Sequence, residues 1–197
     1  MNLPNRLTVL RIMMIPLIIL VYLFPFAQFN IYIPIYYISN IPISLVDIAV
    51  LVLFCIASFT DFLDGHIARK NDLITTFGKF ADPIADKLLV NSLYIMFLSK
   101  GIIPAVPVII MISRDTIVDG CRMIAAQSGI VAAAGYMGKL KTVLQMLSIV
   151  LILINNLPFE LLRLPVSDIV LWFATFISVS SGYSYFNQLK EYIFESK

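Results

Sequence analysis

The chain has 197 residues, of which 60% are hydrophobic and only 13% are charged, about half the ~25% charged fraction of a typical soluble domain. A soluble fold of this length has too little interior to bury so much apolar surface. The composition therefore excludes a cytosolic enzyme, a disordered chain, a collagen-like fibre and a secreted disulfide scaffold. It predicts an integral membrane protein with a single domain over 1–197, and the net charge of +2 gives no reason to expect nucleic acid as a partner.

Apolar runs recur along the chain, and about 20 helical residues are needed to cross a bilayer. We expect an all-α integral membrane protein with six transmembrane helices. Their predicted ranges are 7–26, 45–68, 82–100, 102–125, 139–158 and 167–190. Between the first two helices, prolines, polar residues and tyrosines interrupt the apolar run. Because tyrosines are enriched at the membrane surface, we expect an interfacial loop there.

The basic residues sort to one side of these predicted helices. If the N-terminus is cytosolic, only Lys100 and Arg163 fall on the outer side. The inner ends then carry Arg6, Arg11, Arg69, Lys70, Lys79, Lys87, Arg122, Lys139, Lys141, Lys190 and Lys197. Because loops on the cytosolic side of membrane proteins are enriched in Lys and Arg, both termini are expected to be cytosolic.

Charged residues in the middle helices are too close together to remain outside the bilayer. Thirteen uncharged residues separate Asp47 from Asp61, and thirteen separate Lys100 from Arg114. At 1.5 Å per residue each interval spans about 20 Å, short of the roughly 30 Å hydrocarbon core. Ionisable side chains at such depth normally face a cavity or the bundle interior. We therefore expect Asp61 and Arg114 to lie below the inner membrane surface.

Four aspartates fall at the inner ends of the second and third predicted helices. Asp61 and Asp64 are three residues apart, and Asp82 and Asp86 are four apart, so each pair shares one helix face. Carboxylates that converge in a low dielectric repel one another unless cations neutralise them. Two divalent cations would do so. Oxygen-only ligands favour Mg²⁺ or Mn²⁺, and paired ions of this kind commonly bridge phosphate groups.

Small residues accompany the four acids. Gly65 and Ala68 leave room for a flat group such as a nucleobase, and Gly78 permits close approach of the backbone to a ligand. Packing and loop formation explain each of these residues equally well when it is taken alone. A membrane aspartate pair alone would also suit a proton or ion relay. The lone histidine, His66, is interpreted as incidental.

All eight positions fall in one motif, Asp61-x2-Asp64-Gly65-x2-Ala68-Arg69-x8-Gly78-x3-Asp82-x3-Asp86. This motif resembles the signature of the CDP-alcohol phosphotransferase family in every element and gap. Members of that family displace CMP from a CDP-linked lipid or alcohol by a second alcohol, and six transmembrane helices match their architecture. The resemblance implies metal binding by Asp61, Asp64, Asp82 and Asp86, with Asp86 as the general base. It further implies a CDP site lined by Asp64, Gly65, Ala68, Arg69 and Gly78.

Three further stretches resemble the bacterial subgroup of this family that uses CDP-diacylglycerol and glycerol 3-phosphate. They are Asn2-Leu-Pro4-Asn5-Arg-Leu-Thr8-Val-Leu-Arg11, Ser113-Arg114-Asp115 and Gly138-Lys139-Leu-Lys141-Thr142. The resemblance implies transfer of a phosphatidyl group to glycerol 3-phosphate, with phosphatidylglycerol phosphate and CMP as products. It also implies a bacterial-type plasma membrane and a homodimer among membrane lipids. The distribution of the basic residues adds the expectation of an active site at the cytosolic face.

Three cations are candidates for holding the acceptor phosphate. Arg114, Lys139 and Lys141 are expected on the same side of the membrane as the acids, where an arginine fork and lysine point charges suit phosphate. Simpler roles stay open, because the two lysines could be anchors at the membrane surface. Arg114 could instead pair with Asp115 or Asp119.

The N-terminal segment is harder to interpret. Asn5 and Thr8 are possible site residues, but both could also cap the first helix. We interpret Arg6 and Arg11 as orientation signals or contacts for lipid headgroups rather than as ligands.

Other functions remain open at this point. Another CDP-alcohol transferase, of the phosphatidylinositol phosphate synthase or cardiolipin synthase type, would use the same cations for its acceptor. A membrane prenyltransferase also pairs aspartate motifs around Mg²⁺ and pyrophosphate, but with different spacings. An ion or proton transporter would account for buried carboxylates, but transporters often contain duplicated halves, and no internal repeat is visible.

Overall fold

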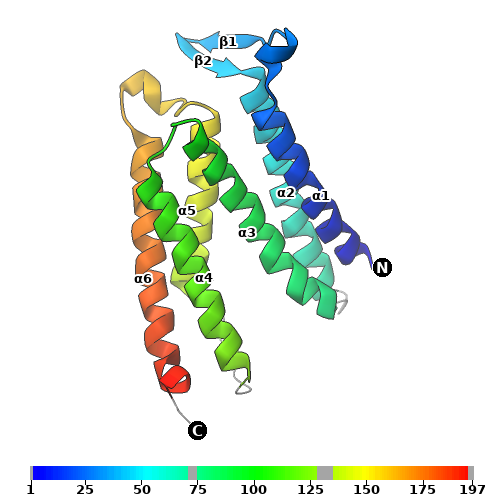
Figure 1. Ribbon diagram of the computed structural model, residues 1–197, viewed down its shortest axis with the longest axis vertical. Coiled ribbons are helices and arrows are strands. Elements are labelled where there is room, and N and C mark those ends of the chain that lie inside the picture. The colour runs from blue at the N-terminus through cyan, green and yellow to red at the C-terminus, as the bar shows by residue number, and fades with distance from the viewer. Residues whose placement is uncertain (1, 71–74, 128–134, 195–197) are drawn as a thin grey trace.

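The computed structural model describes residues 2–70, 75–127 and 135–194, which are mostly helical (Figure 1). The helices are α1 (Leu3–Leu23), α2 (Leu45–Lys70), α3 (Thr76–Ser99), α4 (Ala105–Gln127), α5 (Tyr136–Leu153) and α6 (Val166–Phe194). Each of them overlaps one of the six predicted ranges, with ends displaced by a few residues. The largest displacement is at α3, which begins at Thr76 because Thr75 caps it.

A small β-hairpin occupies part of the segment that the sequence assigned to a loop. Strand β1 (Ile35–Ile38) pairs antiparallel with β2 (Ile41–Ser44). The two residues of the turn, Ser39 and Asn40, both have positive φ, as two-residue hairpin turns usually require. Short 3-10 helices lie at Phe26–Phe29 and Phe159–Leu162. The mostly helical fold is confirmed, and the hairpin is an addition that was not foreseen.

The six helices form two groups of three (Figure 1). In the first group α1 packs against α2 and α3, and in the second α6 packs against α4 and α5. A continuous apolar core joins them, with Phe97 of α3, Met111 of α4, Ile149 of α5 and Leu171 of α6 all buried. Both termini lie at the end of the molecule opposite the hairpin (Figure 1).

Four helices in the described part of the chain have windows long and apolar enough to cross a membrane. These windows are Asn5–Leu23, Leu45–Gly65, Tyr136–Leu153 and Val166–Lys190. Helices α3 and α4 are of similar length, but charged residues interrupt their apolar runs. Large apolar side chains such as Phe173 and Phe176 are exposed on the outer faces, as expected where lipid rather than water is the solvent. The chain is therefore a membrane protein, as its composition predicts.

Candidate active site

The four predicted aspartates meet where α1, α2 and α3 pack together. Asp61 and Asp64 lie on α2, and Asp82 and Asp86 lie on α3. Three of them contact one guanidinium of α1: Nη1 of Arg11 lies 2.7 Å from Asp61 Oδ1 and 2.8 Å from Asp86 Oδ1. Nη2 of the same residue lies 2.6 Å from Asp64 Oδ2. The helical spacing therefore brings the carboxylates of two helices into one cluster.

The structure corrects the interpretation of Arg11 as an orientation signal or a contact for lipid headgroups. Its side chain is 0% exposed, so it is not available as a contact for lipid headgroups. A buried guanidinium is costly unless it is paired and hydrogen-bonded, and here three carboxylates supply those partners. Arg6, on the same helix, is exposed. Its interpretation as a charge near the membrane surface stays a prediction.

Thr8 also belongs to the acid cluster. Helix α1 begins at Leu3 with Asn2 as its N-cap, so the alternative that Asn5 or Thr8 caps this helix is wrong. The Thr8 hydroxyl is buried and donates a 2.6 Å hydrogen bond to Oδ1 of Asp82. Helix α1 thus contacts all four acids through two of its side chains, one turn apart.

A chain of hydrogen bonds fixes the start of α3. The hydroxyl of Thr75, the N-cap, accepts a 3.0 Å bond from the Gly78 amide and donates a 2.7 Å bond to Oδ1 of Asn5. A Cβ added at Gly78 would lie 3.3 Å from Thr75 Oγ1 and 3.6 Å from Asp82 Oδ2. The glycine therefore leaves room for the Thr75 hydroxyl at the start of α3, beside Asp82.

The remaining motif residues lie on α2. Gly65 directly follows Asp64. The side chains of His66, Ala68 and Arg69 lie outside the described part of the chain, so the roles predicted for Ala68 and Arg69 stay predictions.

A pocket of about 360 Å³ opens beside Asp82 and Asp86. Its opposite wall comes from the second helix group and includes Arg114 of α4 with Lys139 and Lys141 of α5. The structure therefore brings the three predicted phosphate-binding cations to one cavity with two of the four acids. Such a cavity, with acids on one wall and cations on the other, can hold a reacting group and an anionic group together.

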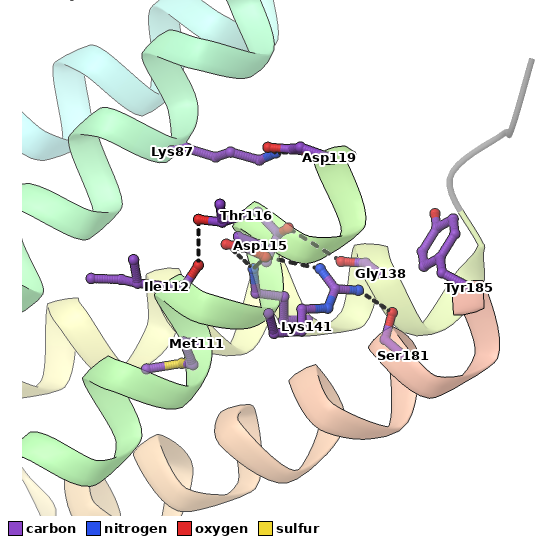
Figure 2. Close-up of polar contacts among 12 residues, drawn as sticks. Lys87, Met111, Ile112, Asp115, Thr116, Asp119, Gly138, Lys141, Ser181 and Tyr185 are labelled. Carbon is purple, nitrogen blue, oxygen red and sulfur yellow. Dashed lines mark hydrogen bonds and ion pairs between the residues drawn. The ribbon is translucent and has the colours of Figure 1, made fainter. Parts of the chain in front are cut away.

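The three cations differ in their surroundings, as Figure 2 shows for Lys141. Lys141 is buried, and its Nζ donates to Asp115 Oδ2 at 2.5 Å. Arg114 donates to Asp115 Oδ1 at 2.9 Å and to the Ser181 hydroxyl at 2.6 Å. Of the two pairings left open for Arg114, the structure has the one with Asp115. Lys139 is exposed, so its charge faces the cavity opening.

The sequence analysis missed several residues around this pocket. Arg122 donates a 2.6 Å hydrogen bond to the Tyr185 hydroxyl, which also accepts from the Gly135 amide at 2.8 Å. The Arg122 guanidinium lies 4.7 Å from the centre of the Tyr185 ring. Lys87 of α3 forms an ion pair with Asp119 of α4 (Figure 2). Helix α6 is thus part of the site, although it carries none of the predicted residues.

The chemistry of the acid cluster fits a hard divalent cation, because every candidate ligand is a carboxylate oxygen. By formal charge, four carboxylates against the single Arg11 leave three negative charges. Among the described residues, however, no three acidic, histidine or cysteine side chains are placed to hold an ion together.

Comparison with known proteins decides the family, because residues 1–180 match the family described as CDP-alcohol phosphatidyltransferase. The chain belongs to this family. It is 42% identical over 187 residues to the "CDP-diacylglycerol--glycerol-3-phosphate 3-phosphatidyltransferase" of Bacillus subtilis (strain 168), covering 95% of this chain and 94% of that protein. A protein of the same name from Rickettsia typhi is 40% identical over 192 residues, or 97% of this chain and 98% of that protein.

As a CDP-alcohol phosphatidyltransferase, the chain is a membrane-embedded enzyme that handles phosphorylated substrates. The family predicted from the motif is confirmed. Neither a prenyltransferase nor an ion transporter agrees with a match that covers nearly the whole chain.

Proposed function

We propose that this enzyme transfers the phosphatidyl group of CDP-diacylglycerol to sn-glycerol 3-phosphate, giving phosphatidylglycerol phosphate and CMP. The printed names of relatives similar over almost their whole length support this reaction. The observation that carries it is the pocket with Asp82 and Asp86 on one wall and Arg114 and Lys139 on the other. An acceptor with its own phosphate needs cations beside the point where its hydroxyl reacts.

The acid cluster would hold the metal. In this proposal two Mg²⁺ or Mn²⁺ ions are held by Asp61, Asp64, Asp82 and Asp86. When bound, such ions neutralise the pyrophosphate and favour loss of the acceptor's hydroxyl proton. Gly65, Ala68, Arg69 and Gly78 would line the CDP site together with Asp64. The position of Gly78 beside Asp82, where an added Cβ would lie 3.6 Å from Asp82 Oδ2, supports this placement.

Asp86 is the proposed general base, because it belongs to the acid cluster and also lines the pocket. Its carboxylate would take the proton of the acceptor hydroxyl. The hydroxyl oxygen would then form a bond to the phosphorus that carries diacylglycerol, while the bond from that phosphorus to the CMP oxygen breaks. CMP leaves with the electron pair, and no covalent enzyme intermediate is needed. Positioning and charge stabilisation supply the rest, as in phosphoryl transfer generally.

Arg114, Lys139 and Lys141 would hold the acceptor phosphate. Their three positive charges and the one negative charge of Asp115 sum to +2 by formal charge, which matches a phosphate dianion. Lys139 supplies a charge at the cavity opening, and Arg114 supplies a planar fork. The buried pair of Lys141 with Asp115 keeps the wall in place.

The proposed topology has six membrane crossings in a single domain, with both termini and the pocket at the cytosolic face of a bacterial-type plasma membrane. The distribution of basic residues supports it, as does the position of both termini at the end opposite the hairpin (Figure 1). A homodimer is proposed from the resemblance to the family.

The reaction is tested with purified protein in detergent, supplied with Mg²⁺, CDP-diacylglycerol and one acceptor at a time. We expect CMP release with glycerol 3-phosphate and much less with inositol 1-phosphate, serine or phosphatidylglycerol. Faster release with inositol 1-phosphate or phosphatidylglycerol would assign the enzyme to another branch of the family. CMP release that persists in EDTA would contradict the metal-assisted reaction.

Gly182 of α6 allows Arg114 to reach its place in the pocket wall. A Cβ at this position would lie 2.9 Å from Cγ of Arg114 and 3.4 Å from its Nε. Because Cγ belongs to the stem of the side chain, Gly182→Ala should displace the whole guanidinium. We expect the KM for glycerol 3-phosphate to rise about tenfold, equivalent to about 1.4 kcal/mol, with a smaller change for CDP-diacylglycerol.

Steady-state kinetics with each substrate varied in turn measures this effect. Gly120→Ala is the matched control, because a Cβ at Gly120 of α4 meets nothing within 4 Å. Equal kinetics for the two variants would show that Arg114 is not held by its contact with α6.

A further inference from the structure

Arg11 is placed among the carboxylates that are proposed to bind metal. Its guanidinium contacts one oxygen each of Asp61, Asp64 and Asp86 at 2.6 to 2.8 Å, and the side chain is fully buried. These three oxygens come from two helices and converge on one group. The guanidinium therefore occupies the point at which the carboxylates meet.

A metal ion and this guanidinium compete for the same lone pairs. Mg²⁺ requires oxygen ligands at about 2.0–2.1 Å in near-octahedral geometry. In this structure Nη1 of Arg11 takes one oxygen each of Asp61 and Asp86, and Nη2 takes one of Asp64, and no three acids in the described ranges stand ready to hold an ion. Arg11 and the metal are therefore expected to exclude one another.

The bonding of Arg11 is incomplete. Its Nε is buried and has no hydrogen-bond partner among the described residues, and a buried donor without a partner destabilises the fold. An arginine that was only a permanent structural element would gain from a partner there. Arginine is always charged, so it can neutralise the acids whenever no other cation does.

We propose that Arg11 is an internal counter-ion that exchanges with the divalent metal. In the metal-free protein it prevents repulsion among the carboxylates, and metal binding moves its side chain out of the cluster. Because α1 carries this cation permanently at the site, Arg11 weakens the apparent metal affinity. The inference rests on the proposed function, since it assumes that these aspartates are the metal ligands.

Binding of Mn²⁺ to purified protein in detergent tests this exchange, with free Mn²⁺ measured by its EPR signal. Arg11→Met keeps an unbranched apolar stem and removes the charged guanidinium. We expect it to bind Mn²⁺ about tenfold more tightly than the wild type, a coupling within the usual range, and to unfold at a lower temperature without metal. Arg6→Met is the control, because Arg6 is an exposed arginine on the same helix, and both of its values should match the wild type.

Arg11→Lys extends the test if the methionine variant does not fold. Its ammonium retains the charge but lacks the planar fork that spans three carboxylates, so Mn²⁺ should again bind more tightly than to the wild type. Unchanged or weaker Mn²⁺ binding in the variants that fold would overturn the exchange but leave the metal site in place. Absence of Mn²⁺ binding in the wild type would overturn both this inference and the proposed metal site.

Discussion

Asp86→Asn is expected to abolish CMP release while the protein stays folded. Asp86 lines the pocket and bonds to Arg11 at 2.8 Å, so it is placed to act on an acceptor in the cavity. An amide of the same shape cannot take a proton from the acceptor hydroxyl. Loss of a general base typically costs a factor of about 10²–10⁴ in rate, and loss of a metal ligand adds to it.

CMP release per minute and the unfolding temperature should be measured together for this variant. Asp168→Asn is a suitable control, because Asp168 lies in the first turn of α6 and lines a different cavity together with Asn40 and Pro42 of the hairpin. We expect wild-type turnover from the control. Normal turnover by the Asp86 variant would exclude Asp86 as the base.

Arg114→Met is expected to impair the use of glycerol 3-phosphate much more than the use of CDP-diacylglycerol. A hydrogen bond to a charged group contributes about 1.5–3 kcal/mol, so the KM for glycerol 3-phosphate should rise roughly 10- to 150-fold. Asp115 keeps Lys141 as a partner, so the wall should survive the substitution. Arg114→Lys should recover part of the loss, because it restores the charge without the fork.

The discriminating measurement is the preference for glycerol 3-phosphate over glycerol, which lacks the phosphate. The Arg114 variant should lose most of this preference, whereas Arg163→Met, a change in the loop before α6, should keep it. An equal loss of activity with glycerol 3-phosphate and with glycerol would show that Arg114 does not contact the acceptor phosphate.

The acid cluster was predictable because its geometry is local. Spacings of three and four residues fix each pair of aspartates on one helix face. The short connection between α2 and α3 then places the pair Asp61 and Asp64 near the pair Asp82 and Asp86. The side chain of Arg114 is 13% exposed and lines the pocket, as expected of an ionisable residue in a membrane helix, while its depth in the bilayer stays a prediction.

The role of Arg11 was not predictable, because it depends on how α1 packs. Nothing in the spacing of α1 shows that one face of it meets both α2 and α3. An arginine near the N-terminus is equally consistent with an orientation signal. The pairing of Arg11 with three acids that lie 50 to 75 residues further along the chain becomes visible only in the folded structure.

The contribution of α6 was hidden for a different reason. Ser181, Gly182 and Tyr185 carry no charge and follow no known motif, yet they set the position of Arg114 and Arg122. One signal for Arg122 was available. Arg114 and Arg122 are eight residues apart, so they share a face of α4 about two turns apart.

The hairpin was missed because its strands do not alternate clearly. Tyr36 and Tyr37 are adjacent and both exposed, and Pro42 lies within β2. Proline is confined mainly to edge strands, which a two-stranded hairpin provides. Sequence criteria therefore favoured a loop over this segment.

The central claim is that the aspartates of α2 and α3 gather around divalent cations beside the acceptor pocket. Anomalous diffraction from crystals grown with Mn²⁺ and CDP-diacylglycerol, recorded near the manganese edge, tests it most directly. We predict anomalous peaks among Asp61, Asp64, Asp82 and Asp86, with the Arg11 side chain withdrawn. Manganese bound elsewhere, or carboxylates still closed around Arg11 with no peak between them, would contradict the claim.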